Sequence, residues 1–257
     1  MKQLKKILII LLKKLDLCSA LAMRLVKITG KSNEMVHPKH LINYKIWFAD
    51  KLNKKDFVLD VGCGNGFTLI RLKSKIAKAI GVDVNPDLIK IANNLVQKRK
   101  AKNLRFIIMN ANKRLPFKNK TFDKVICIDV LEHLEKRNFA IKEIARVLKN
   151  NGTLFLVTDN PDTSWKKLQK SVGVFYYADK DHKYEYTKSE IIGLLRRNQF
   201  DVISIDYITY DTPLKGLIDL VGGVSLAIYK ELRHLREEMV KKFPQETTGF
   251  RIEAKKL

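Results

Sequence analysis

The sequence is poor in the residues that mark several common protein classes. Its 257 residues include only 3 cysteines, 6 prolines and 12 glycines. These low numbers exclude a disulfide scaffold, a collagen-like repeat and a low-complexity chain. The cysteines, Cys18, Cys63 and Cys127, are far apart, and no Cys/His spacing is typical of zinc. We therefore predict no metal site, and buried thiols in a reducing cytoplasm.

Long hydrophobic runs are also lacking. The longest run near the N-terminus covers residues 7–12 and is cut off by Lys13 and Lys14. A membrane span needs about 18 apolar residues, and a secretory signal peptide needs a longer uninterrupted core. We therefore expect a cytoplasmic protein that at most touches a membrane surface as a peripheral protein.

Acidic residues are scarce relative to basic ones. There are 50 Lys and Arg against 27 Asp and Glu, which gives a net charge of +23. Lysine outnumbers arginine 38 to 12, and Ile and Asn are frequent as well. All three frequent residues have A/T-rich codons, so the charge fits either genomic bias or a basic surface for nucleic acid or anionic lipid.

Residues 2–28 have the pattern of a basic amphipathic helix. Such a helix can lie in a lipid headgroup layer, or it can pack its apolar face on the rest of the protein and keep its lysines in water. The basic side comprises Lys2, Lys6, Lys13, Arg24 and Lys27, and the apolar side Leu4, Leu8, Leu11, Leu15, Ala22 and Val26, with Ile9 among the basic residues. A second short helix is expected over residues 39–52, so residues 1–52 form an N-terminal part that precedes the domain at 53–257.

Strand and helix patterns alternate from Phe57 onward, which predicts βαβ units and a parallel sheet covered on both faces. The sequence Asn85-Pro86-Asp87 is typical of a helix start, and Asn150-Asn151-Gly152 of a helix end. Strands are expected at 57–61, 79–84, 104–109, 122–128, 153–158, 200–208 and 248–254, and helices at 135–149, 188–198 and 214–242. Residues 159–186 are expected to be irregular.

The most informative segment is VLDVGCGNG, residues 58–66. A buried strand ends in Asp60 and runs into glycines at every second position. Such a loop lets a ligand approach the backbone closely, at the strand edge where open α/β sheets bind nucleotides. Asp83 ends the next strand, where its carboxylate can accept both hydroxyls of a ribose. A dinucleotide motif would need a glycine at position 67, which is Phe67.

On these residues the chain resembles the class I S-adenosylmethionine-dependent methyltransferases of the broad type 11 group. The resemblance is dense over residues 40–160 and loose beyond. The matching segments are VLDVGCGNG (58–66), GVDVNPDLIKIA (81–92), NANKRLPFKNKTFD (110–123), LEH (131–133) and EIARVLKNNG (143–152). It implies a Rossmann-like sheet of seven strands, mostly parallel with the last strand antiparallel. The helical pattern at 214–242 would then be an insertion before that last strand.

The resemblance also implies how S-adenosylmethionine is held. Asp60 and the loop glycines would hold its methionine part and Asp83 its ribose. The end of the third strand would hold the adenine, where Asn110 and Asn112 replace the family's usual acid. The full set implied for the cofactor is Asp60, Gly62, Cys63, Gly64, Gly66, Asp83, Val84, Asn110, Ala111, Asn112 and Ile128.

The cofactor carries the reactive methyl group, so the protein mainly aligns the nucleophile with it. A base is needed only where the nucleophile carries a proton. The candidates are Asp129, Glu132, His133 and His182, of which His133 has a suitable intrinsic pKa range. Two plainer alternatives stay open: Glu132 and His133 open a helix and satisfy its first turn, and His182 is a solvated loop histidine.

Two classes of methyl acceptor stay open. The segments at about 159–186 and 211–245 would lie on the acceptor side of the domain. The basic N-terminal helix and the apolar start of residues 214–242 favour a small-molecule, lipid-linked or glycan-linked acceptor handled at an anionic membrane surface. The charge of +23 favours transfer RNA or another RNA as the alternative.

Overall fold

The computed structural model describes residues 2–33, 35–42 and 45–257. The chain forms two compact units. Unit 1 contains Met1–Tyr44, Asn160–Lys180 and Tyr207–Gly249, and unit 2 contains Lys45–Asp159, Asp181–Asp206 and Phe250–Leu257. The first break thus falls at residue 44 instead of 52, and the helices after residue 214 belong with the N-terminal helix instead of with the sheet domain.

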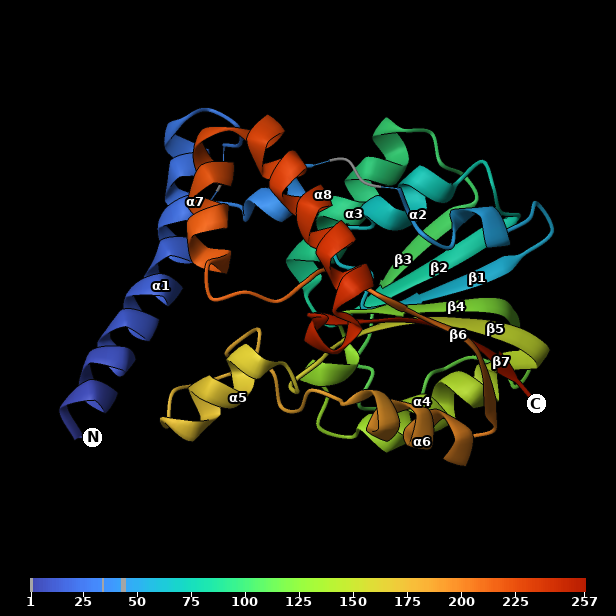
Figure 1. Ribbon diagram of the computed structural model, residues 1–257. Coiled ribbons are helices and arrows are strands. Elements are labelled where there is room, and N and C mark those ends of the chain that lie inside the picture. Colours follow the sequence, from blue (N-terminus) through green and yellow to red (C-terminus); the bar gives the residue numbers. More distant parts are fainter. Residues whose placement is uncertain (1, 34, 43–44) are drawn as a thin grey trace. The chain divides into compact units, whose positions relative to one another are not determined.

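The described part of the chain forms a seven-stranded sheet in the order β3-β2-β1-β4-β5-β7-β6 (Figure 1). Pairing is parallel from β3 through β5. At the other edge, Leu257 N–H donates to Gln199 O and Ile208 N–H donates to Gly249 O, so β7 runs antiparallel to β6. The strands are β1 (Phe57–Val61), β2 (Lys78–Asp83), β3 (Leu104–Ile108), β4 (Phe122–Ile128), β5 (Leu148–Asp159), β6 (Phe200–Tyr207) and β7 (Gly249–Lys256). The predicted fold class is confirmed.

Helices cover both faces of this sheet, as expected for parallel strands joined by crossovers. Figure 1 shows α2 and α3 on one face and α4 and α6 on the other. Their bounds are α2 (Phe67–Leu72), α3 (Pro86–Lys98), α4 (Arg137–Val147) and α6 (Lys188–Arg197). The core beneath α2 and α3 contains Leu69, Ile89, Ala92 and Phe106, all at most 4 % exposed. This packing fixes the carboxyl edge of the sheet, and the loops that follow the strands project from that edge.

The predicted start of α3 is confirmed. The Asn85 side chain accepts hydrogen bonds from the N–H groups of Asp87 at 2.9 Å and Leu88 at 3.3 Å. Pro86 occupies the first helical position, where its missing N–H costs nothing. The cap ties the helix to the end of β2, which carries Asp83.

The prediction of a helix over residues 39–52 is wrong. Residues 43 and 44 lie outside the described residues, and the described part of this segment contains only two short 3-10 turns, η1 (Pro38–His40) and η2 (Ala49–Lys51). Phe48 is fully buried and stacks on Phe155 of β5 with ring centroids 4.8 Å apart. Burial of this ring on the sheet outweighs the weak helical pattern.

The segment expected to be irregular contains a helix, α5 (Ser164–Ser171). Its first turn is capped by Thr163, whose hydroxyl accepts from Lys166 N–H and donates to Asp211. The predicted end of α4 also differs: the helix stops at Val147, and residues 150–152 already belong to β5, with Asn151 in the left-handed region.

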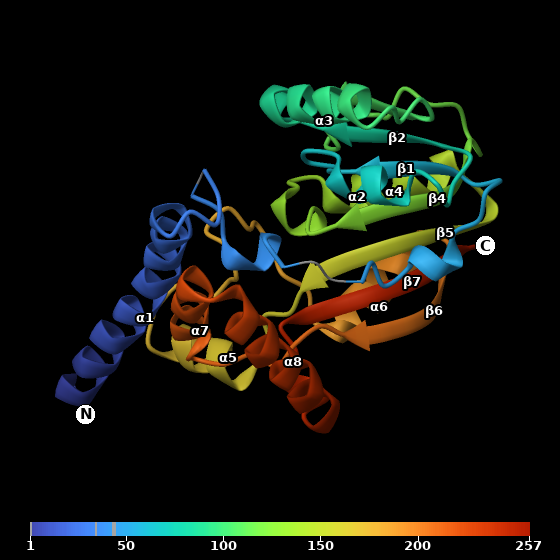
Figure 2. The same ribbon diagram turned by 90° about the horizontal axis from the view of Figure 1, so that it is seen from above.

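Unit 1 is built on helix packing. Helix α7 (Lys215–Val224) lies beside α1 (Lys2–Ile28), and both views show the pair (Figures 1 and 2). A side chain at Gly216 would clash with the Leu15 carbonyl, so the two backbones approach closely there. The Ser19 hydroxyl donates to the buried Asp219 at 2.7 Å. Helix α8 (Leu226–Lys242), the turn η4 (Pro244–Glu246), helix α5 and the turn η1 also belong to this unit.

Within residues 2–33, 35–42 and 45–257, no helix is both long enough and apolar enough to cross a membrane.

Candidate active site

The loop after β1 adopts the conformation for which its glycines are suited. Gly62, Gly64 and Gly66 all have positive φ, at 71°, 53° and 75°. A side chain at Gly62 would clash with Val130, and a Cβ at Gly66 would lie 2.5 Å from Phe106. Only glycine satisfies the turn and this close packing together. The loop is therefore held in one shape, with its backbone available to a ligand.

Asp83 fixes the glycine loop in place. Its Oδ2 accepts a hydrogen bond from Gly64 N–H and its Oδ1 accepts one from Asn85 N–H, both at 2.9 Å. Asp83 ends β2, next to β1 in the sheet. The two predicted features, the loop and the second acid, are thus one connected structure.

Asp60 lies on β1 behind this loop and is 4 % exposed. Burial, with a smaller contribution from the negative charge of Asp83, raises the pKa of Asp60 to about 8. The same two causes and Asp60 itself raise the pKa of the buried Cys63 thiol, which is therefore unreactive at neutral pH. The negative charge of Asp83 acts on Asp60, and two acids so close together suit a cationic ligand.

The side chains after β3 are occupied locally. Asn110 Oδ1 accepts from Asn112 N–H at 2.8 Å, and Asn112 Oδ1 accepts from the N–H groups of Glu135 and Lys136. Asn112 therefore braces the loop before α4, and Asn110 is the better placed of the two for an adenine. Ala111 is partly buried, and Val84, after β2, is exposed.

The end of β4 carries the predicted catalytic residues. Ile128 is its last residue and partly buried, and Asp129 follows in the left-handed region at φ 53° with its side chain exposed. His133 is exposed at the end of the turn η3 (Leu131–His133). Its ring meets that of His182 edge to face, with centroids 4.6 Å apart. The structure thus brings two of the four candidate bases into contact.

The plainer alternatives for Glu132 and His182 are both wrong. His182 is buried, and its Nδ1 lies 2.9 Å from Glu185 Oε1. Glu132 is fully buried, and within the described part of the chain neither of its carboxylate oxygens has a hydrogen-bond partner, so its side chain satisfies no helical turn. Burial raises the pKa of Glu132 well above its ordinary value, and Asp129, Asp159 and Glu185 add to this rise.

Comparison with known proteins identifies the family. A family model described as a methyltransferase domain matches residues 59–156, all within unit 2. The ubiquinone biosynthesis O-methyltransferase of Coxiella burnetii strain Dugway is 30% identical over 203 residues, which cover 74% of this chain and 83% of that protein. The chain belongs to the S-adenosylmethionine-dependent methyltransferases. The predicted resemblance and the predicted cofactor are confirmed.

Other methyltransferases match over less of their length or share only the fold. The uncharacterized methyltransferase YcgJ of Bacillus subtilis is 34% identical over 100 residues, 39% of each protein. The chain spans less than half the length of this and two further curated relatives. The crystal structure of an S-adenosylmethionine-dependent methyltransferase of Methanosarcina mazei superposes with a TM-score of 0.59 at 20% identity. That match covers 84% of this chain and 99% of that one.

Proposed function

We propose that this methyltransferase transfers the methyl group of S-adenosylmethionine to a small-molecule acceptor, with the cofactor at the carboxyl edge of the sheet of unit 2. The observation that carries the proposal is the glycine loop with three positive φ angles, joined to Asp83 by the Gly64 hydrogen bond. A nucleotide bound there meets backbone N–H groups and two carboxylates that favour a cation.

Different residues bind different parts of the cofactor. Asp60 and the glycine loop hold the methionine part, Asp83 the ribose and Asn110 the adenine, with Ile128 backbone alongside. The bound cofactor supplies a methyl group on a positively charged sulfur, which leaves as a neutral thioether when the nucleophile attacks in line. The protein positions the nucleophile. His133, exposed beside the end of β4, is our candidate to accept a proton from a hydroxyl acceptor, with Asp129 as the second.

A hydroxyl on a lipid-linked or free small molecule is the acceptor class we favour. The support is the relatives of Coxiella burnetii and Pelagibacter ubique, which are named as ubiquinone biosynthesis O-methyltransferases. The comparisons lend no support to the RNA alternative, which rested on the net charge and on basic clusters such as Lys98-Arg99-Lys100.

A transfer assay tests the proposal. The purified chain is incubated with radiolabelled methyl-S-adenosylmethionine and an extract of the source cells, which is then separated into lipid, small-molecule, RNA and protein fractions. We expect label in the lipid or small-molecule fraction. Label confined to RNA or protein would contradict the proposed acceptor class.

Two variants test the proposed cofactor site through its affinity for S-adenosylmethionine. Asp83→Ala loses the carboxylate that fixes the loop, and we expect cofactor affinity to fall by about 1.5–3 kcal/mol, as for lost hydrogen bonds to a charged group. Asp87→Ala is the matched control, since Asp87 is exposed in the first turn of α3. Equal affinity of the two variants in calorimetric titration would refute the ribose assignment.

We further propose that the outer face of α1 rests on an anionic lipid surface. Its inner face is buried within unit 1 through Leu12, Ala22 and Val26. Yet the exposed face carries a second row of large aliphatic side chains, at helical spacing: Ile10 (54 % exposed), Leu17 (67 %), Leu21 (49 %) and Ile28 (78 %). This second row was not foreseen, because sequence analysis assigned one side of the helix to lysine.

Charge complementarity points to lipid as the occupant of this face. Lys6, Lys14, Arg24 and Lys27 are exposed on the same helix. The only acid in its sequence is Asp16, whose side chain lies outside the described part, as do those of Lys2, Leu4, Leu8 and Lys13. Aliphatic side chains flanked by cations are typical of helices that lie in a headgroup layer.

Vesicle flotation tests this surface. We expect the protein to float with phosphatidylglycerol vesicles and not with phosphatidylcholine vesicles, and the double variant Leu17→Gln/Leu21→Gln to remain in the dense fraction. Leu235→Gln is the matched control, an exposed leucine on α8. If the double variant instead converts a dimer to a monomer in light scattering, a second copy of the chain covers this face and the lipid proposal is wrong.

A further inference from the structure

Glu132 is an anomaly among the buried side chains of unit 2. It is 0 % exposed, and neither carboxylate oxygen has a hydrogen-bond partner among the residues that the structure describes. An isolated carboxylate in a protein interior is strongly disfavoured, so buried carboxylates are generally paired, protonated or bound to a metal. Since no described side chain pairs with Glu132, it is neutralised either by a proton or by a bound cation.

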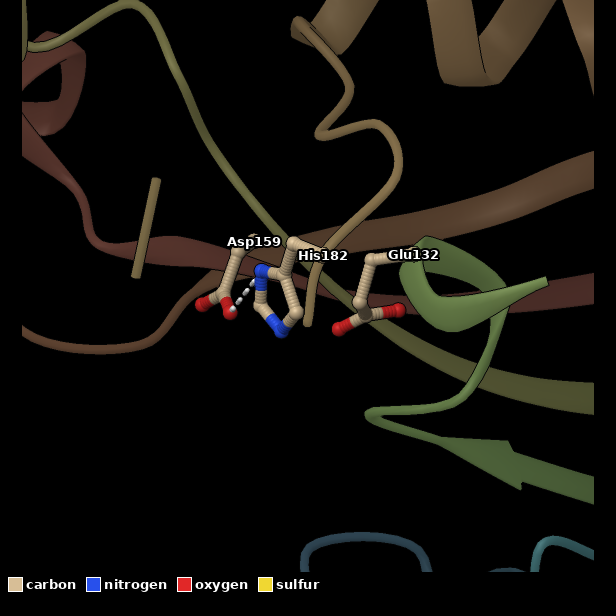
Figure 3. A group of neighbouring side chains, drawn as sticks. All are labelled: Glu132, Asp159 and His182. Atoms are coloured by element: carbon tan, nitrogen blue, oxygen red, sulfur yellow. Dashed lines mark ion pairs between the residues drawn. The ribbon is translucent and has the colours of Figure 1, made fainter. Parts of the chain in front are cut away.

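Two further ligand-type side chains surround this carboxylate. Figure 3 shows Glu132, Asp159 and His182 directed toward one another from three separate elements. One potential ligand atom from each lies within 4.8 Å of the other two. Ligand atoms on one first-row ion, at about 2.1 Å each, lie at most about 4.2 Å apart. Small side-chain movements would thus close a coordination shell.

The neighbouring residues orient these side chains as they do around metal centres. Glu185, 1 % exposed, hydrogen bonds to His182 Nδ1, which leaves Nε2 to face a ligand. A carboxylate behind a metal-binding histidine typically sets the ring orientation and raises its basicity. Glu185 would play this positioning role.

The backbone locks the same arrangement. Glu132 and Asp159 follow the carboxyl ends of the adjacent parallel strands β4 and β5. The main-chain carbonyl of Glu132 accepts from Lys183 N–H at 2.7 Å and Tyr184 N–H at 3.3 Å. The carbonyl of Asp159 accepts from Tyr186 N–H at 3.2 Å. The two strand ends therefore hold the loop that carries His182.

We propose that Glu132, Asp159 and His182 bind a divalent first-row transition-metal ion. Two carboxylates and one imidazole suit such ions, and the ion would offset the negative charge that Asp129 and Glu185 add nearby. Asp159 is 22 % exposed, so the ion has a route to solvent. Three protein ligands leave at least one coordination position for an oxygen from outside the chain. The proposal concerns ion binding and does not depend on the methyl acceptor.

Mn²⁺ binding to the chelator-treated, full-length protein tests this site. Free Mn²⁺ is followed by electron paramagnetic resonance, and Zn²⁺ is then added as a competitor. We expect one Mn²⁺ per chain, displaced by Zn²⁺, and a higher Tm with either ion. Glu132→Gln keeps the shape of the side chain and should weaken binding by roughly 100-fold or more, and Glu185→Gln by about 10-fold.

Glu135→Gln is the matched control, because Glu135 is an exposed acid three residues after Glu132. It should bind Mn²⁺ like the unaltered protein. Should Glu132→Gln fail to fold, Asp159→Asn and His182→Gln provide the same comparison. If the unaltered protein binds no ion stoichiometrically and Glu132→Gln has an unchanged or raised Tm, a proton and not a metal neutralises Glu132, and the proposal is wrong. Because the readout is ion binding, failure here leaves methyl transfer untouched.

Discussion

At the residue scale, Asp60 makes a prediction about pH. Burial and Asp83 raise its pKa to about 8, so much of Asp60 is protonated at pH 7 in the free protein. A cationic cofactor favours the ionised carboxylate. We therefore expect cofactor binding to release a proton below pH 8, and affinity to rise with pH, at most about tenfold per unit, and level off above pH 8.

Calorimetric titrations in phosphate and in Tris measure this proton release directly. The variant Asp60→Asn, which cannot ionise, should show weaker binding with no pH slope in this range. The free energy of unfolding depends on pH in the opposite direction. Between about pH 4 and 8 the folded protein holds a proton on Asp60 that the unfolded chain has released, so stability falls as pH rises through this range. A pH-independent affinity of the unaltered protein would refute the assigned role of Asp60.

The sequence predicted the loop and acids at the carboxyl edge of the sheet, where we propose that the cofactor binds. It did not predict the cluster of Glu132, Asp159 and His182. Positive φ, a strand-end acid and a cap each depend on neighbours within a few positions, so glycine spacing and Asp83 were visible in the sequence. The proximity of His182 to Glu132 depends on a loop that returns across 50 residues of chain. In sequence, Asp-Lys-Asp-His resembles a solvated loop, because burial by a distant strand end leaves no local pattern.

At the element scale, the same distinction separates correct from incorrect predictions. The strands of the parallel sheet and helices α3 and α6 were predicted because their apolar periodicity is strong and their caps are local. Residues 39–52 were predicted wrongly, since Phe48 stacks on Phe155, about a hundred positions later. Helix α5 was missed because its cap, Thr163, is completed by Asp211. Tertiary partners decided both cases, and single-sequence periodicity does not contain them.

Helix α1 illustrates an element with two apolar faces. The prediction assumed one apolar and one basic side, as in most surface helices. Helix α7 packs through Gly216 against Leu15 and through Gly223 against Ala22. The row from Ile10 to Ile28 remains exposed. Helix α1 packs within its own unit and still exposes five large aliphatic side chains, the row from Ile10 to Ile28 and Leu11, which is the basis of the lipid proposal.

At the scale of the whole molecule, the chain passes between its two units five times, after residues 44, 159, 180, 206 and 249. Helices α1 and α7, which pack together in unit 1, are therefore joined in sequence only through unit 2. Once unit 2 unfolds, a long unstructured loop must be closed to keep α1 on α7, which costs conformational entropy. We infer that both units unfold in one cooperative transition.

Hydrogen exchange with and without S-adenosylmethionine tests this coupling. A ligand at 100 times its Kd stabilises the folded state by about 2.7 kcal/mol, which slows globally exchanging amides about 100-fold. We expect this factor for the slowest amides of β1 and equally for those on the buried face of α1, near Ala22 and Val26. If β1 is protected and α1 exchanges at its former rate, α1 opens on its own. The two units would then not unfold in one cooperative transition, and the inferred coupling would be wrong.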